Sequence, residues 1–166
     1  MRGAKDARVR RENVQRLYDE HGAGLLAYAC SMLGDRSTAE DVLHQVFLRL
    51  LAGNMAIPND PRAYLYRAVR NAALNVYRSA PRRVELNLDQ AWFEAPPGIT
   101  DAGLELQGAL YELPGEQREV IMLRIWGGMT LEEAAAVLGI PPNTAASRYR
   151  YGLVKLRERM GPRAGE

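Results

Sequence analysis

The strongest signal for the fold lies in residues 130–150, which read TLEEAAAVLGIPPNTAASRYR. Thr130 and Glu133 have the spacing of a capping box, in which a hydroxyl and a carboxylate satisfy free backbone N–H groups. The box predicts a short helix over 131–138. Gly139–Pro141 then predicts a tight turn, and a longer helix follows at once. This order of short helix, glycine-containing turn and second helix is the layout of a helix-turn-helix.

The second of these helices, expected over 142–160, has an apolar face centred on Tyr149 and a polar face opposite. The polar face carries amide, hydroxyl and guanidinium groups in the first turns, where such helices read base edges in the major groove. A plain helical hairpin with a polar outer face is the alternative, but cap, turn and face together favour DNA reading. The candidate contacts to duplex DNA are Asn143, Thr144, Ser147, Arg148, Arg150 and Tyr151.

Toward the N-terminus, Asp60 and Pro61 predict the start of a helix that runs to Ser79. The outer face of this helix interleaves an aromatic ring with arginines and amides. Rings stack on unpaired bases, cations contact phosphates and amides reach base edges, so the face suits single-stranded nucleic acid. A surface tyrosine on an ordinary basic helix explains the pattern equally well. The candidate residues are Tyr64, Arg67, Arg70, Asn71, Asn75 and Arg78.

A further helix is expected from a capping box at Ser37 to about residue 52, and it is apolar on more than one face. If one stripe faces the core, then Phe47, Leu48 and Leu51 point elsewhere. Such a patch predicts a protein partner. The alternative is a helix that is fully buried in a small bundle.

Charge divides the chain into blocks although the formal net charge is only +2. Residues 61–84 hold six arginines and no acid, residues 85–119 hold eight acids and one base, and residues 120–160 are basic again. With another helix expected over 14–33 and no helical period from Pro81 onward, the sequence predicts an all-α protein of two small helical domains. The predicted boundaries are 1–80 for the first domain, 81–103 for a flexible acidic linker and 104–166 for a helix-turn-helix domain.

The composition provides few of the side chains that commonly carry out catalysis. The 166 residues include one cysteine, Cys30, and two histidines, and no phosphate-binding glycine loop is visible. We therefore expect no metal, no cofactor and no enzyme activity. No apolar run reaches the roughly 18 residues of a membrane span, and the N-terminus lacks the apolar core of a secretion signal. We expect a cytoplasmic protein without membrane insertion.

Four segments, in order, resemble bacterial sigma factors of the extracytoplasmic-function (ECF) group. Residues 39–49 resemble the polymerase-binding helix of that family, and residues 61–71 its helix that melts and holds the minus-ten promoter element. Residues 113–120 resemble the start of its C-terminal domain, and residues 131–148 its helix-turn-helix that reads the minus-thirty-five element. The resemblance implies a promoter-specificity subunit that binds core RNA polymerase and directs initiation at dedicated promoters.

The resemblance also implies partners and contacts. The helix from Ser37 would dock on the clamp helices of the largest polymerase subunit, and the C-terminal domain on the flap of the second-largest. Promoter DNA, both duplex and single-stranded, and an anti-sigma factor are further implied partners. The polymerase contacts carried over by position are Asp41, His44, Gln45 and Phe47.

The loop over 53–59 falls where the family captures a flipped-out base of the non-template strand, a step that costs a few kcal/mol. Asn54, Met55 and Asn59 are the candidates there. The chain departs from the usual family residues at His44, Gln45, Tyr64, Asn75 and Ala146.

Two other functions compete with this interpretation. A stand-alone helix-turn-helix regulator would bind duplex DNA without polymerase. A sigma-mimicking decoy would sequester an anti-sigma protein, but such decoys usually carry a receiver domain for which 166 residues leave no room.

Overall fold

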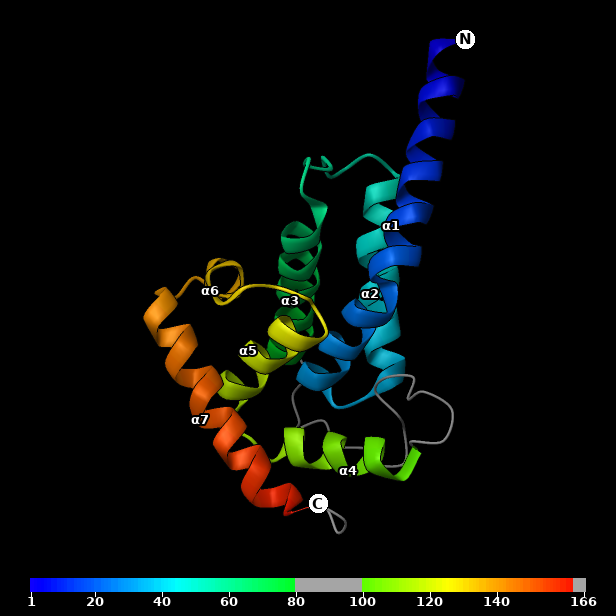
Figure 1. Ribbon diagram of the computed structural model, residues 1–166. Coiled ribbons are helices and arrows are strands. Elements are labelled where there is room, and N and C mark those ends of the chain that lie inside the picture. The colour runs from blue at the N-terminus through cyan, green and yellow to red at the C-terminus, as the bar shows by residue number, and fades with distance from the viewer. Residues whose placement is uncertain (80–99, 163–166) are drawn as a thin grey trace.

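The computed structural model describes residues 1–79 and 100–162, and within these ranges the chain forms seven helices and no strand (Figure 1). The predicted all-α class is therefore confirmed. The helices are α1 (Arg2–Leu33), α2 (Arg36–Leu51), α3 (Pro61–Ser79), α4 (Thr100–Tyr111), α5 (Gly115–Ile125), α6 (Leu131–Leu138) and α7 (Pro142–Met160).

Two boundaries differ from the sequence prediction. Helix α1 begins at Arg2, well before Val14, because residues 2–13 contain no proline and a single glycine, although these residues lack an apolar period. Helix α4 begins at Thr100, inside the predicted linker, because one glycine within a helix costs only about 1 kcal/mol. The rest of that linker, residues 81–99, lies outside the described residues.

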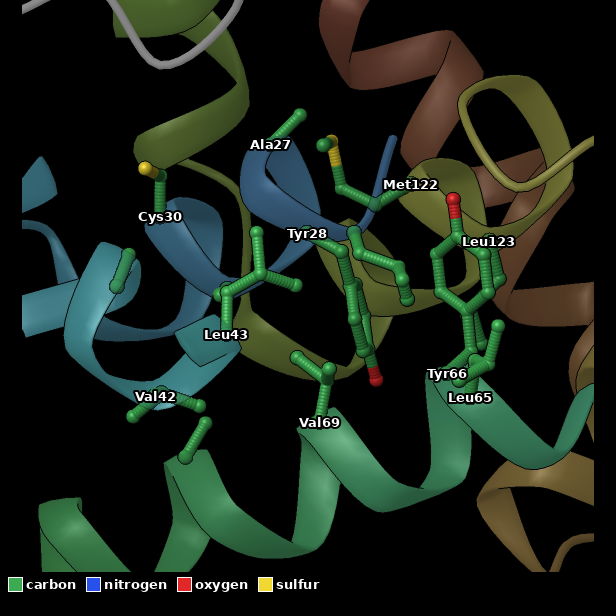
Figure 2. Close-up of a cluster of buried hydrophobic side chains, with 14 of the residues drawn as sticks. Ala27, Tyr28, Cys30, Val42, Leu43, Leu65, Tyr66, Val69, Met122 and Leu123 are labelled. Atoms are coloured by element: carbon green, nitrogen blue, oxygen red, sulfur yellow. The ribbon is translucent and has the colours of Figure 1, made fainter. Parts of the chain in front are cut away.

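Helices α1, α2 and α3 form an N-terminal unit around a shared apolar core (Figure 2). The prediction that Phe47 points away from this core is wrong. Its side chain is only 5% exposed and meets the Tyr18 ring edge-on, with 5.1 Å between ring centroids. Leu48 and Leu51 do point to the surface. The fully buried centre of the unit includes Leu25, Tyr28, Leu43, Leu50, Leu65 and Tyr66.

The N-caps of helices α2 and α6 show how neighbouring polar residues compete to cap a helix. Helix α2 is capped by Asp35, whose carboxylate accepts a hydrogen bond from the Thr38 backbone N–H at 2.9 Å, so the predicted capping box at Ser37 is wrong. The Thr38 hydroxyl also donates to this carboxylate, and the bond from the hydroxyl and then the bond from the N–H lower the pKa of Asp35, because both favour the ionised carboxylate. At α6 the predicted cap is confirmed, since Thr130 Oγ1 accepts from the Glu133 N–H at 3.1 Å.

Helices α4 to α7 form a C-terminal unit that contains the predicted helix-turn-helix. Helix α6 ends at Gly139, whose φ of 67° is the left-handed conformation that glycine adopts without strain, and α7 starts directly after the turn. Helix α7 packs across α5 and α6 (Figure 1). The close approach of α7 to α5 occurs at Gly152, where a Cβ atom would lie 2.7 Å from Ile121 Cδ1.

The Gly152→Leu variant should therefore lose about 1–3 kcal/mol of unfolding free energy, because overpacking a buried contact forces side chains and backbone to shift. Thermal unfolding followed by circular dichroism measures this loss. Gly108→Leu in α4 is the matched control, since no atom lies within 4 Å of its added Cβ. The control should unfold at the same temperature or higher, because leucine favours a helix over glycine. Equal destabilisation by both changes would contradict the packing role.

The two units lie against each other rather than apart. Helix α1 contacts α5 and helix α3 contacts α6, and the buried side chains of both units form one continuous cluster. At Gly24 of α1 an added Cβ would lie 2.9 Å from the Trp126 carbonyl oxygen, so this approach needs a glycine. None of the described helices combines the length and apolarity that a bilayer crossing requires.

Candidate nucleic-acid interface

The outer face of α3 carries the residues predicted to hold single-stranded nucleic acid. Arg67, Asn71, Asn75 and Arg78 are exposed, whereas Tyr64 and Arg70 are half-buried. The two asparagines line a groove of about 550 Å³ between α2 and α3. Its wall also includes Met55 from the loop and Gln45 and Arg49 from α2. The structure thus brings Asn71 and Asn75 together with Met55, a predicted loop contact, and Gln45, a predicted polymerase contact.

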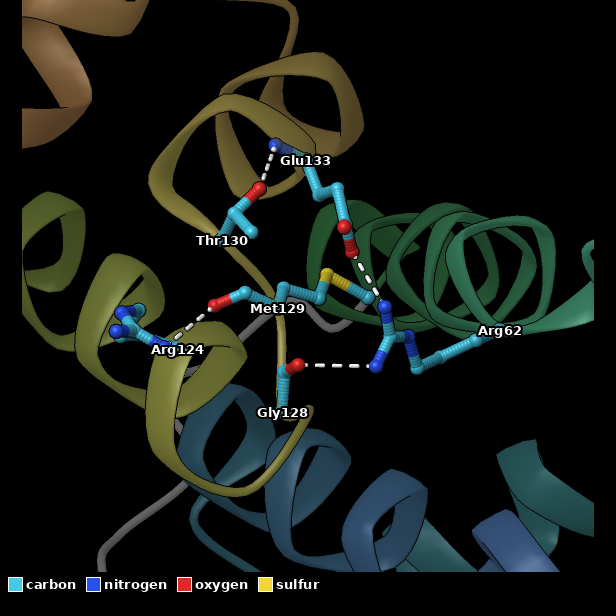
Figure 3. A network of polar contacts seen from close by, with 6 residues as sticks. All are labelled: Arg62, Arg124, Gly128, Met129, Thr130 and Glu133. Carbon is cyan, nitrogen blue, oxygen red and sulfur yellow. Dashed lines mark hydrogen bonds and ion pairs between the residues drawn. The ribbon is translucent and has the colours of Figure 1, made fainter.

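Three arginines of α3 are hydrogen-bonded to the C-terminal unit, and Figure 3 shows the first of them, Arg62. Arg62 donates to the Gly128 carbonyl oxygen at 2.9 Å and forms an ion pair with Glu133 at 2.5 Å. Arg67 donates to the Ala136 carbonyl oxygen at 3.1 Å. The Glu133 carboxylate therefore pairs with α3 in place of the backbone N–H expected in a capping box.

A third contact joins Tyr28, Arg70 and Glu119, from α1, α3 and α5. The Glu119 carboxylate accepts hydrogen bonds from Arg70 Nε and from the Tyr28 hydroxyl, both at 2.8 Å. Burial and then the charge of Glu119 raise the pKa of the Tyr28 hydroxyl, which keeps the hydroxyl a donor. Burial opposes the charge on Arg70, but the bond to Glu119, the charge of Glu119 and the interaction with Tyr28 together outweigh burial, and the pKa of Arg70 is raised.

We call these contacts of Tyr28, Arg62, Arg67 and Arg70 with α5, α6 and their connecting segment the closed interface. Within it, Arg67 and Arg70 are two of the predicted single-strand contacts. An arginine that binds phosphate must first exchange its protein partner for the phosphate oxygen. The closed interface therefore competes with nucleic acid for the same guanidinium groups.

Sequence reasoning missed Arg62, Glu119 and Glu133 as parts of this interface. These contacts join residues 49 to 91 positions apart, so no local pattern of charge or periodicity indicates them. The only sequence signal is the alternation of basic and acidic blocks, which is compatible with many pairings.

Helix α7 places its predicted DNA-reading residues on and beside the outer face. Asn143, Arg150 and Tyr151 are exposed, and the Arg150 guanidinium lies over the Tyr151 ring, 5.3 Å from its centroid. Arg148 lies 3.7 Å from Glu116 of α5. Thr144 and Ser147 are half-buried, and the buried face holds Ala145, Gly152 and Leu156.

Helix α2 exposes a mixed polar and apolar surface. Leu48 is 62% exposed and Leu51 is 41% exposed, next to the exposed side chains of Asp41, His44 and Gln45. Of the predicted polymerase contacts only Phe47 is buried, so its place is beneath this surface rather than on it. Large exposed leucines on a polar-rimmed helix are typical of a protein-binding surface.

The loop between α2 and α3 holds the remaining predicted residues. Asn54 and Asn59 are exposed, and Met55 is half-buried. Gly53 starts the loop with a φ of 76°. In the part of the chain that the structure describes, no three histidine, cysteine, aspartate or glutamate side chains gather closely enough to hold a metal ion.

Comparison with known proteins finds a family match in each of the two helical units. Residues 17–83 match the family described as Sigma-70 region 2, and residues 103–156 match Sigma-70, region 4. The chain is 34% identical over 155 residues to the ECF RNA polymerase sigma factor SigL of Mycobacterium tuberculosis, covering 87% of this chain and 86% of that protein. It is 33% identical over 140 residues to the ECF sigma factor EcfG of Rhodopseudomonas palustris, covering 80% and 76%.

A solved structure shares the fold over most of both chains. It is the sigma factor RpoE of Bartonella quintana in complex with the anti-sigma factor NepR. The TM-score is 0.72 at 25% identity, and the match covers 90% of this chain and 97% of the other.

Proposed function

The chain belongs to the ECF group of RNA polymerase sigma factors, and on that premise we propose which of its surfaces bind promoter DNA and which bind core polymerase. The protein is a promoter-specificity subunit that directs transcription initiation. The observation that carries this conclusion is the 34% identity to a sigma factor over 87% of the chain, with regions 2 and 4 in order.

For the minus-ten element, we propose that the α3 face and the α2–α3 groove hold the melted non-template strand. The support is chemical, since exposed arginines stand beside a groove lined by Asn71 and Asn75. Stacking and charge each favour unpaired DNA on such a face. Tyr64, Arg67, Arg70 and Arg78 complete the proposed contacts, and Asn54 belongs to the adjoining loop.

For the minus-thirty-five element, we propose that α7 enters the major groove with Asn143, Thr144, Ser147, Arg148, Arg150 and Tyr151. The support is that these residues cluster in the first turns of the second helix of a helix-turn-helix, with the opposite side of the helix buried.

Replacing Arg148 by alanine should weaken binding of the minus-thirty-five duplex by about 1–3 kcal/mol, the usual worth of one good contact to a base. Fluorescence anisotropy with a labelled duplex measures the change. Arg157→Ala removes the same charge from the last turn of α7, away from the first turns that carry the reading residues, and should leave the affinity near that of the wild type. Unchanged affinity of the Arg148 variant at every duplex sequence tested would remove Arg148 from the reading surface.

For core polymerase, we propose that the exposed α2 surface docks on the clamp helices of the largest subunit and the C-terminal unit on the flap of the second-largest. The support is the exposed Leu48 and Leu51 beside Asp41, His44 and Gln45. An anti-sigma factor is a further proposed partner, because the structurally similar RpoE is bound to one.

Run-off transcription on fragmented host DNA tests the function directly. Core polymerase with this protein should produce discrete new start sites that core polymerase alone does not produce. Absence of such transcripts from a core that is active with another sigma factor would contradict the function. Tight duplex binding by the protein alone would then favour a regulator, and capture of an anti-sigma protein would favour a decoy.

A further inference from the structure

A hollow of about 220 Å³ lies between the N-terminal and C-terminal units. Met32 of α1 and Leu74 and Tyr77 of α3 line it from the N-terminal unit. Gly115 and Arg118 of α5 line it from the C-terminal unit. The hollow therefore exists only while the two units are in contact. Since a cavity of about 150 Å³ holds one benzene molecule, the hollow has room for a molecule with a single ring.

Arg118 brings a positive charge to this hollow. Its Nη1 atom donates to the carbonyl oxygens of Tyr111, at 2.7 Å, and Leu113, at 3.5 Å. Arg118 takes part in none of the ion pairs between described residues. Burial lowers the pKa of Arg118, and the charges of Tyr111 and Glu119 offset this effect only in part. The guanidinium therefore lacks a carboxylate bonded to it.

The other terminal nitrogen of Arg118, Nη2, is open because Gly115 has no side chain. A Cβ on Gly115 would lie 3.7 Å from Nη2, and no other atom would come within 4 Å of that Cβ. Among the described residues, Nη2 has no hydrogen-bond partner. A carboxylate is the acceptor that suits such a group, because charge-assisted hydrogen bonds to guanidinium are short and strong.

The rest of the hollow is mainly apolar. Glu119 also lines it, but the Glu119 carboxylate already accepts hydrogen bonds from Arg70 and Tyr28, so its charge is paired. The wall on α1 and α3 is formed largely by aliphatic and aromatic groups, and the Tyr77 ring at its edge is 59% exposed. Apolar walls with a few polar groups that fix orientation are typical of small-molecule sites.

We propose that this hollow binds a small organic carboxylate with an apolar body, and that the bound carboxylate holds the two units together. The carboxylate accepts from Arg118 Nη2, and the apolar body packs on Met32, Leu74 and Tyr77. A ligand that binds only the closed arrangement shifts the population toward it. Closure also occupies arginines of the α3 face, so the ligand lowers the affinity for single-stranded DNA. That last consequence rests on the proposed function of α3.

The binding test uses the full chain and 4-fluorobenzoate as the probe, followed by fluorine NMR. The wild type should bind the probe saturably. 4-Fluorobenzamide, which has the same ring and no charge, should bind at least about tenfold more weakly, because it loses the charge-assisted bond. Absence of saturable binding of 4-fluorobenzoate, or equal binding of the two probes, would overturn the proposal.

Two variants locate the bound probe. Arg118→Gln should weaken 4-fluorobenzoate binding at least about tenfold. Its control is Arg124→Gln on the same helix, since Arg124 also donates to a backbone carbonyl, that of Met129 at 3.0 Å, but does not line the hollow. Equal weakening by both changes would overturn the proposal. Circular dichroism checks that each variant is folded.

The second variant leaves the bonds of Arg118 in place. In Gly115→Leu the new side chain fills the space beside Nη2 and should weaken 4-fluorobenzoate binding at least about tenfold. Gly108→Leu is the control, because Gly108 lies outside the hollow and its added Cβ meets no atom within 4 Å. Binding by Gly115→Leu at the wild-type level would place the ligand elsewhere, so this variant decides the matter even if Arg118→Gln does not fold.

Forcing the units apart tests the coupling to closure. At Gly24 an added Cβ would lie 2.9 Å from the Trp126 carbonyl oxygen, and Gly24 does not line the hollow. Gly24→Leu should separate the units, and energy transfer between dyes on them measures the closed fraction. The apparent affinity for 4-fluorobenzoate should fall by the same factor as that fraction. Wild-type affinity in the separated protein would overturn the coupling. These measurements contain neither DNA nor polymerase, so their outcome is independent of the proposed function.

Discussion

The Glu119→Gln variant should shift the protein from the closed arrangement toward separated units by about tenfold to a hundredfold. The Glu119 carboxylate accepts from both Tyr28 and Arg70 at the contact between α1, α3 and α5. Hydrogen bonds to a charged group contribute about 1.5–3 kcal/mol, and about 1.4 kcal/mol corresponds to a tenfold change in an equilibrium. The neutral amide keeps the shape of the side chain but removes the charge that holds Arg70.

Energy transfer between dyes on the two units measures the shift. Affinity for a single-stranded oligonucleotide with the non-template sequence of the minus-ten element should rise as the units separate, because Arg70 becomes available. The control is Glu116→Gln, which removes the same charge from the same helix. Glu116 is 73% exposed and pairs with Arg148 inside its own unit. Opening to the same extent in both variants, or in neither, would contradict a closing role for Glu119.

The Leu48→Asp variant should lose at least about 2 kcal/mol of affinity for core polymerase, roughly a thirtyfold weakening. Leu48 is the most exposed large apolar side chain of α2 and stands at the centre of the proposed docking surface. A few central side chains carry most of the binding energy of an interface, and a carboxylate there must be desolvated without a partner. Competition against a labelled sigma factor for core polymerase measures the loss.

The control places the same charge elsewhere on the N-terminal unit. Tyr77 of α3 is 59% exposed, and Tyr77→Asp should leave core binding unchanged. Both variants should unfold at nearly the wild-type temperature, because neither side chain belongs to the buried core. If core binding survives Leu48→Asp, the exposed face of α2 is not the docking surface.

Local chemistry explains which sequence predictions succeed. The cap at Thr130, the turn at Gly139 and the start of α3 at Pro61 depend on residues within a few positions of one another, and all three are confirmed. The prediction at Ser37 fails for a local reason too, because Asp35 offers a better placed carboxylate two residues earlier. The prediction for Phe47 fails for a different reason, since the ring that covers this side chain, Tyr18, belongs to another helix.

By itself, the amino-acid sequence determines the helices, the helix-turn-helix and the resemblance to a sigma factor, because caps, turns and helical periods act over a few residues. It also supplies the cations of the α3 face. Only the tertiary structure decides that Arg62, Arg67 and Arg70 are paired across the closed interface. The physical reason is distance along the chain. An ion pair between residues tens of positions apart exists only after packing has brought their helices together.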